Sequence, residues 1–185
     1  MTSIRLFILG ALSRSGPMHG HQIRRLARID RTELWTDVKP GSLYAALHRL
    51  EAEGAIKAVS TAQDGNLPTR VVYDLTEDGH HELVAYRDEA LRDVELRPAP
   101  VDLALQNTSD MPADQLTAAI EDRRRLLQSQ LDNWEHLYET AAPHLHDLEA
   151  MTFRHSLVRL TAEIAWHDEL LAALPEYLRK RDGPS

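Results

Sequence analysis

The sequence has no cysteine among its 185 residues. Disulfide bonds, thiolate zinc sites and cysteine nucleophiles are therefore excluded, which fits a protein of a reducing, cytoplasmic compartment. No apolar run approaches the roughly 18 residues that a membrane-spanning helix requires, so no membrane partner is expected. The apolar stretch at residues 6–12 follows a single arginine and lacks a nearby small-x-small cleavage site. We expect a buried first helix there rather than a signal segment.

Sequence motifs that carry catalysis are also absent. There is no Gly-x-Ser-x-Gly, no phosphate-binding loop and no His-Glu-x-x-His. Three close pairs stand out among the ten histidines: His19/His21, His80/His81 and His144/His146. Side chains one or two positions apart on a helix point in different directions, and no pair has an acidic neighbour at a recognised ligand spacing. We therefore expect no enzymatic activity, no metal site and no cofactor.

Positive charge is scarce over most of the chain, whose net charge is -8. The balance differs along the sequence: residues 1–75 hold 10 Lys and Arg against 7 Asp and Glu, whereas residues 76–185 hold 11 against 22. The acidic total argues against a protein that binds any nucleic acid through bulk charge. The asymmetry suggests that the two parts have different roles, although ordinary solvated surface would give a similar balance.

What the sequence does contain is organised around residues 39–57. Pro40 and Gly41 predict a turn, Ser42 is a plausible N-cap, and Gly54 is placed to end the helix in a left-handed conformation. Four apolar residues between them recur at helical spacing and predict a buried stripe: Leu43, Ala46, Leu47 and Leu50. The opposite face suits close approach to a DNA major groove, because small residues lie beside hydrogen-bonding groups. It holds Gly41, Ala45, His48 and Ala52, with Tyr44 and Arg49 on its flanks.

The surrounding segments follow the order of a winged helix-turn-helix. Thr76 is placed to cap a helix that reaches about residue 94. We therefore predict a mainly α fold with a two-stranded β-wing. Helices are predicted over residues 3–13 and 19–28, strands over residues 55–60 and 69–75, and a hairpin loop over residues 61–68.

The rest of the chain is helical. Two long helical patterns, residues 113–140 and 147–179, are separated by Pro143, and a short helical turn is expected near residues 101–106. Helices of this length usually bury their apolar stripe against a partner chain, so we expect a homodimer; an intramolecular helical hairpin is the alternative. The predicted division is residues 1–80 for DNA binding, 81–111 for a connecting helix and linker, and 112–185 for a helical dimerisation and effector domain.

Several segments of the N-terminal half match a known family. The clearest are Gly41-Ser-Leu-Tyr44, Arg49-Leu-Glu51 and Glu53-Gly-Ala-Ile56. Further matches are Leu9-Gly-Ala-Leu12, His19-Gly-His-Gln-Ile23 and the spaced set Arg70, Tyr73, Leu75, Thr76 and Gly79. On these residues the chain resembles the PadR family of transcriptional regulators over residues 3–95. The C-terminal half is similar to the longer helical domain of that family in length and pattern.

The resemblance implies a winged-helix DNA-binding domain, a dimer held by C-terminal helices, and repression of a nearby promoter, often relieved by a small molecule. The implied partners are operator DNA, a second copy of the chain and a small-molecule effector. By motif, the residues that would face DNA are Gln22, Ser42, Tyr44, His48 and Arg49, with the loop before Arg70 as the wing tip. Phosphate contacts are expected from Arg24, Arg25 and Lys39.

The chain departs from the family pattern in two places. Gly20-His21 stands where relatives often have Gly-Tyr. The wing tip is poorly basic, since Asp64 is present and Arg70 is the only positive residue there, where relatives often carry two or three Lys or Arg. Phosphate contacts give DNA binding its salt dependence. We therefore expect the DNA affinity of this protein to depend only weakly on salt.

Several of these residues also have a purely structural interpretation. Tyr44 could belong to the core, and Arg49 could pair with Glu53 four positions further on. Trp134 and Trp166 could be helix core or a wall of an apolar effector pocket. The whole domain could be a protein-interaction or ligand-sensing module that does not read DNA. The feature that discriminates is a positive patch around Arg24, Arg25, Lys39, Arg49 and Arg70.

Overall fold

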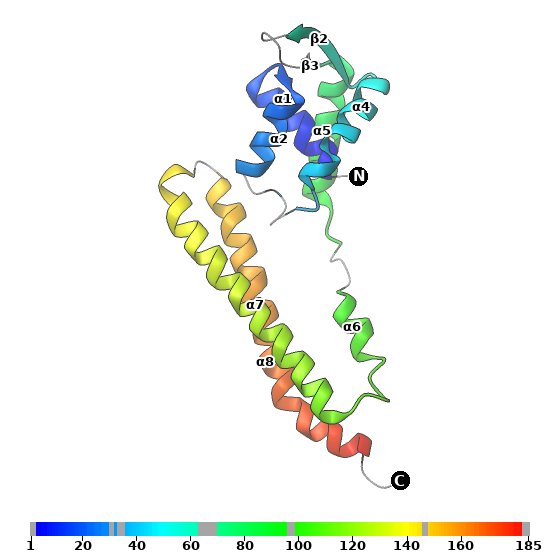
Figure 1. The fold of residues 1–185 in the computed structure, drawn as a ribbon, viewed down its shortest axis with the longest axis vertical. Coiled ribbons are helices and arrows are strands. Elements are labelled where there is room, and N and C mark those ends of the chain that lie inside the picture. The colour runs from blue at the N-terminus through cyan, green and yellow to red at the C-terminus, as the bar shows by residue number, and fades with distance from the viewer. Residues whose placement is uncertain are drawn as a thin grey trace. The chain divides into compact units, whose positions relative to one another are not determined.

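The computed structural model of the protein describes residues 3–29, 32, 36–62, 70–95, 99–145 and 148–182. Its contacts divide the chain into two compact units, residues 1–95 and 96–185. The described part is mainly helical, with one small antiparallel sheet (Figure 1). None of the helices in this part is long and apolar enough to cross a membrane.

The first unit has the element order of a winged helix-turn-helix, as predicted. Its helices are α1 (Ser3–Ser15), α2 (Gly20–Ile29), α4 (Leu43–Ala52) and α5 (Glu77–Arg92), and a 3-10 turn, η1 (Pro40–Ser42), leads into α4. Its strands are β1 (Met18–His19), β2 (Ile56–Ala62) and β3 (Arg70–Leu75). The helix-turn-helix pair is α2 and α4, and β2 and β3 form the wing.

The sheet holds one strand more than the sequence predicted. β3 lies in the centre, with β1 and β2 antiparallel on either side. The additional strand pairs Met18 with Tyr73 and His19 with Val72, which anchors the segment between α1 and α2 to the wing. A strand of two residues is too short to show an alternating pattern, so periodicity could not reveal it.

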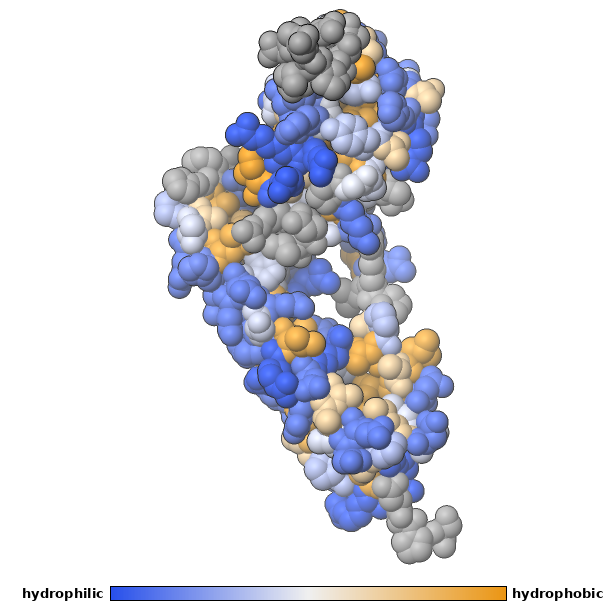
Figure 2. Space-filling model, viewed as in Figure 1, coloured by the Kyte–Doolittle hydropathy of each residue, from blue (hydrophilic) through white to orange (hydrophobic). Residues whose placement is uncertain are grey.

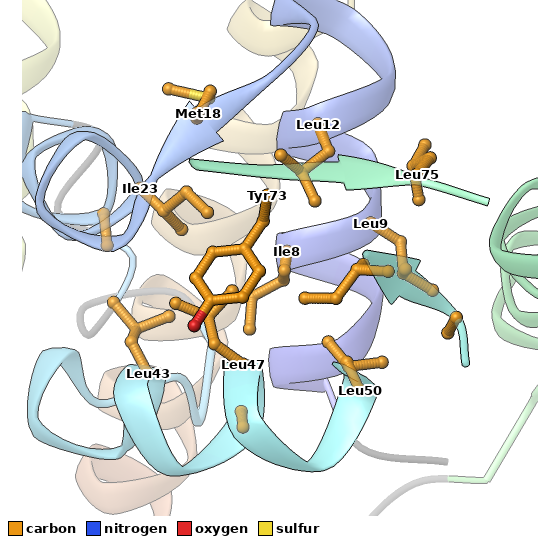
Figure 3. Close-up of a cluster of buried hydrophobic side chains, with 14 of the residues drawn as sticks. Ile8, Leu9, Leu12, Met18, Ile23, Leu43, Leu47, Leu50, Tyr73 and Leu75 are labelled. Atoms are coloured by element: carbon orange, nitrogen blue, oxygen red, sulfur yellow. The ribbon is translucent and has the colours of Figure 1, made fainter. Parts of the chain in front are cut away.

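α4 buries the stripe that its spacing predicted. Leu43, Leu47 and Leu50 point into a cluster with side chains from α1, α2 and the sheet (Figure 3). Tyr73 reaches between the strands and α4, and burial, followed by the negative charge of Glu51, raises the pKa of its hydroxyl. Each fully buried Leu or Ile contributes about 1.5–3 kcal/mol relative to an exposed one. The cluster therefore fixes the rotation of α4 and leaves its opposite face outward.

Backbone contacts join the end of α4 to the start of α5. Gly54 ends α4 with a φ of 79°, the left-handed conformation predicted for it. Thr76 caps α5 as predicted: its Oγ1 accepts from the Gly79 N–H at 3.0 Å and donates to the Gly54 carbonyl at 2.7 Å. A Cβ on Gly79 would stand 2.0 Å from the Ala55 carbonyl oxygen. The start of the wing and the start of α5 therefore pack backbone against backbone.

Arg5 of α1 ties the same region together through its side chain. Its guanidinium donates to the carboxylates of Glu53, just after α4, and of Glu82 on α5. It also lies 5.7 Å from the centroid of the Tyr86 ring. One cation thus links α1, α5 and the C-terminal end of α4.

The second unit is built on a hairpin of two long helices. Its elements are α6 (Pro100–Leu105), α7 (Ala113–Ala141), the 3-10 turn η2 (Ala142–His144) and α8 (Glu149–Asp182). α7 and α8 lie side by side (Figure 1). They are antiparallel, because Trp134 meets Phe153 near the turn and Arg123 meets His167 farther along. Both long helices, and the short one before them, agree with the predicted patterns, and Pro112 stands at the N-cap of α7.

Polar contacts cross the middle of the hairpin. His167 is fully buried, with Nδ1 2.7 Å from the Glu163 carbonyl oxygen and Nε2 3.0 Å from Nε of Arg123. Because an arginine can only donate, Nε2 accepts from Arg123, and Nδ1 faces the Glu163 carbonyl oxygen, which can only accept. Beside it, Nε of Arg124 donates to Asp168 at 2.8 Å, and this hydrogen bond lowers the pKa of Asp168. These pairings fix the register of α7 against α8.

Candidate nucleic-acid interface

The outward face of α4 presents the residues that helical spacing assigned to it, except Gly41, which lies before the helix in η1. Its five residues are all exposed, whereas those of the buried stripe are at most 2% exposed. Two of the five are alanines, whose short side chains leave room at the centre of the face. Hydrogen-bonding groups surround this centre, so the helix can approach the edges of base pairs closely. The face consists of Tyr44, Ala45, His48, Arg49 and Ala52.

Arg49 does not form the predicted alternative pair with Glu53. The Glu53 carboxylate is held by Arg5 instead. Arg49 is exposed and makes no ion pair with any residue that the structure describes. A guanidinium in this state can donate two parallel hydrogen bonds to a guanine or a phosphate. Helical spacing could not identify the competitor, since Arg5 lies 48 residues before Glu53.

Tyr44 is neither a core residue nor a fully free one. Its side chain is 44% exposed at the edge of the outward face. One edge of its ring packs over Gly20 at the start of α2: a Cβ on Gly20 would stand 2.8 Å from Cε1 and 3.3 Å from Cδ1 of the ring. α2 therefore limits how Tyr44 can turn.

Ser42 does not cap α4 in the way that the sequence predicted. It occupies the N-cap position, but its hydroxyl makes no capping hydrogen bond. The hydroxyl donates instead to the Lys39 carbonyl at 2.8 Å, because the preceding residues form the 3-10 turn η1. Both Ser42 and Lys39 are exposed at the entry to α4. The hydroxyl oxygen keeps its capacity to accept a hydrogen bond, whereas its proton is already used.

Gln22 takes part in capping α2. His19 Nδ1 accepts from the Gln22 N–H at 3.1 Å, and Gln22 Oε1 accepts from the His19 N–H at 2.9 Å. This reciprocal pair is a capping box in which histidine takes the usual place of Ser or Thr. The carboxamide of Gln22 is exposed and keeps its NH₂ group for an outside acceptor. The residue predicted to face DNA is thus also a structural residue of α2.

The basic residues of α2 extend beyond the two that the sequence singled out. Arg24 and Arg25 are both exposed, and Arg28, which was not predicted, is exposed on the same helix. His21 and Ile29 join them in lining a surface hollow of ≈ 340 Å³. The signal was present in the sequence, since residues 21, 25, 28 and 29 have the spacing of one helix face. The side chain of Arg70 and residues 63–69 of the wing tip lie outside the described residues, so their predicted contacts stay predictions.

The two tryptophans proposed for an effector pocket lie apart on the hairpin. Trp134 is buried, and its ring meets the edge of Phe153 at 5.2 Å between centroids. Trp166 is half-buried and packs on the neighbouring His167 ring at 4.8 Å. Phe153 and Trp166 are both on α8, where the rise of 1.5 Å per residue separates them by roughly 20 Å. Neither ring is in contact with the other. No group of three or more metal-ligating side chains occurs within the described ranges.

Residues 8–85 match the model of a family described as the transcriptional regulator PadR-like family. Bacillus subtilis PadR in complex with operator DNA is similar over 94% of this chain and 98% of that one, with 21% sequence identity and a TM-score of 0.73. The B. subtilis protein in complex with p-coumaric acid gives a TM-score of 0.71 at 20% identity, over 93% and 98% of the two chains. The Vibrio cholerae virulence activator AphA gives a TM-score of 0.70 at 20% sequence identity, over 94% of this chain and 99% of that one. At these identities the likeness establishes the fold. A comparison with curated proteins finds no match.

Proposed function

Residues 8–85 form a PadR-like transcriptional regulator domain, and on that premise we propose that the protein is a DNA-binding repressor that acts as a homodimer. In this proposal α4 enters the major groove of an operator near a promoter, and α2 and the wing contact the flanking phosphates. A small-molecule effector releases the DNA. The protein works by binding and carries out no reaction.

The observation that carries the proposal is the outward face of α4. Its low alanine centre lets the helix come close, His48 and Arg49 can donate to base edges, and Tyr44 borders them. Arg49 is not neutralised by any described carboxylate. Its guanidinium is therefore available to donate to a base edge or a phosphate.

The homodimer is proposed from the outer face of α8. Five exposed apolar residues there share one helix face, opposite the side that packs on α7. Four of them are small or β-branched, which lets two helices pack closely. Figure 2 shows hydrophobic patches among hydrophilic side chains on the visible face of this unit. The residues are Met151, Val158, Ala162, Ala165 and Ala172.

A twofold dimer would place two copies of α4 in successive major grooves. The half-sites would then lie about one helical turn apart, roughly 34–36 Å between centres. The effector is proposed by analogy with the B. subtilis PadR complex with p-coumaric acid. Trp134 and Trp166 are the candidate aromatic surfaces for it in the second unit, each at its own level of the hairpin.

The test is a fluorescence-anisotropy titration of the full-length protein. One duplex carries the DNA upstream of its own gene, and the control duplex has the same composition in scrambled order. We expect tight binding to the upstream duplex alone. Replacing Tyr44 with alanine should weaken this binding about tenfold, a cost of about 1.4 kcal/mol, and leave the thermal unfolding temperature unchanged.

Equal, weak binding to both duplexes would count against the proposal. It would favour the second interpretation, a winged-helix interaction module that does not read DNA. Unchanged affinity in the Tyr44→Ala variant, with specific binding intact, would remove Tyr44 alone from the interface.

A further inference from the structure

One helix of the first unit gathers positive charge without any negative charge of its own. α2 contains Arg24, Arg25 and Arg28 and no Asp or Glu. His21, Arg25, Arg28 and Ile29 follow one another at i, i+4, i+7 and i+8, so they share one face, and Arg24 borders it. All five side chains line the hollow of ≈ 340 Å³, which we call the α2 hollow.

The α2 hollow brings three unpaired arginines together on one helix, whereas the six other described arginines without a carboxylate partner are spread over α1, α4, α5 and α8. Elsewhere, five arginines each meet a carboxylate: Arg5, Arg92, Arg123, Arg124 and Arg125. Arg24, Arg25 and Arg28 make no ion pair with any residue in the described ranges. An acidic chain, with a net charge of -8, therefore concentrates unpaired guanidinium groups at one hollow. Such a site attracts an anion from outside.

We propose that the α2 hollow is an anion site that takes a phosphate group. Each guanidinium is a planar fork that matches two phosphate oxygens, and a tetrahedral phosphate has enough acceptors for several forks at once, which a single carboxylate has not. The His21 ring adds a further possible donor at the edge. Ile29 and the aliphatic stems of the arginines give the hollow an apolar wall.

The phosphate can come from two sources that share this chemistry. It is either a phosphodiester of the DNA backbone beside the operator or a phosphate on a free molecule. In the first case the inference rests on the proposed function and adds His21 and Arg28 to the DNA contacts. In the second case the inference does not depend on the proposed function.

Two measurements on the full-length protein distinguish these sources. The first is a calorimetric titration with inorganic pyrophosphate. The second is the affinity for a non-specific duplex over a range of salt concentrations, where each lost phosphate contact lowers the slope of log affinity against log salt by about 0.9. The test variant is Arg25→Gln/Arg28→Gln. The matched control, Arg14→Gln/Arg87→Gln, removes the same charge from exposed positions of α1 and α5.

We expect the test variant, and not the control, to lose one of the two signals. A salt slope lower by about 2 assigns the site to backbone phosphate, and pyrophosphate binding that the variant abolishes assigns it to a free phosphorylated ligand. A test variant that matches wild type in both measurements, or a control that loses as much, overturns the proposal. Thermal unfolding by circular dichroism verifies that both variants are folded.

The failure of this inference is separable from failure of the proposed function. Preference of wild-type protein for its upstream duplex over the scrambled one tests the proposed function and does not involve the variants. Specific binding with an unaffected test variant would refute the anion site alone. Pyrophosphate binding without any preferred duplex would refute the proposed function alone.

Discussion

Gly20 has no side chain at the point where α2 passes closest to Tyr44. A Cβ there would stand 2.8 Å from Cε1 of the tyrosine, closer than carbon atoms approach without a shift. The ring is 44% exposed and can rotate away from the added methyl group. The substitution therefore changes the orientation of the Tyr44 side chain and disturbs the core little. Gly20 is thus a positioning residue for Tyr44.

We predict that Gly20→Ala weakens specific DNA binding about tenfold and changes the free energy of unfolding by less than about 1 kcal/mol. Replacing a glycine also stabilises a helix, and this stabilisation offsets part of the strain. A double-mutant cycle with Tyr44→Ala, in which DNA affinity is measured by anisotropy titration, tests whether Gly20 acts through Tyr44. In the Tyr44→Ala background the added methyl meets no ring, so it should cost nothing further in affinity. An equal loss in both backgrounds would mean that Gly20 acts through Leu47, whose Cδ1 the Cβ would meet at 3.2 Å.

The sequence predicted which residues of α4 face outward but not their partners. Leu43 and Leu50 fixed the rotation of the helix through a periodicity that any helix must obey. Arg49 and Glu53 had the spacing of an ion pair, yet Glu53 meets Arg5, a residue brought close only by the fold. Ser42 stood where a cap belongs, yet its hydroxyl turns back to Lys39. Local patterns determine faces, whereas the choice among competing partners depends on tertiary structure.

At the scale of elements, the position of α4 depends on how the wing meets α5. The first turn of α5 approaches the start of β2 without a side chain between them at Gly79. The cap hydroxyl of Thr76 bonds to both sides of this junction. Because the opposing atoms are backbone, they cannot move aside as a side chain would. Close packing here sets the angle between the helix-turn-helix and α5.

We predict that Gly79→Ala lowers the free energy of unfolding by about 3 kcal/mol, at the upper end of what overpacking usually costs. The Cβ would stand 2.0 Å from the Ala55 oxygen, so the wing or α5 must shift. Urea unfolding followed by circular dichroism measures the change.

The matched control is Gly10→Ala in the middle of α1. There a Cβ meets only Nη1 of Arg14, at 3.6 Å, which is an ordinary contact. Removing a glycine from a helix interior should raise the free energy of unfolding by roughly 0.5–1 kcal/mol. Similar losses in both variants would contradict the account of the Gly79 contact.

The elements themselves could be predicted to different degrees. The two long helices of the hairpin were identified almost to their ends because each shows its period several times, whereas the ends of the shorter helices were marked by turn and capping residues. β1 was missed because it has only two residues, and it exists only because β3 offers an unpaired edge to it. The α2 hollow could not be predicted, although His21, Arg25 and Arg28 had helical spacing, because spacing shows which side chains share a face but not whether that face is hollow.

For the whole molecule, the weakly basic wing and the net charge of -8 leave few cations to hold DNA. One PadR-like domain with so few phosphate contacts would bind weakly, since these contacts supply much of the affinity. Two domains joined in a dimer recover affinity, because the second half-site is then reached at a high effective concentration. Dimerisation is therefore required for operator binding in this proposal.

We predict that Val158→Glu/Ala165→Glu converts the proposed dimer into a folded monomer. The two carboxylates would face their symmetry mates across the outer face of α8, where burial without a partner costs several kcal/mol. Sedimentation velocity measures the association state. Ala118→Glu/Ser129→Glu, at exposed positions of α7, adds the same charge and should remain dimeric.

The monomer also tests how the two units depend on each other in function. Its α4 and its α2 hollow are unchanged, so non-specific binding per chain should persist, with the same salt slope per chain. Specific affinity for the two-half-site operator should fall by about a hundredfold, the lower range of what linking two sites contributes. If the variant stays dimeric while the control dissociates, the interface lies on α7 instead. If it becomes a monomer and keeps full operator affinity, a single domain reads the site and the twofold arrangement is wrong.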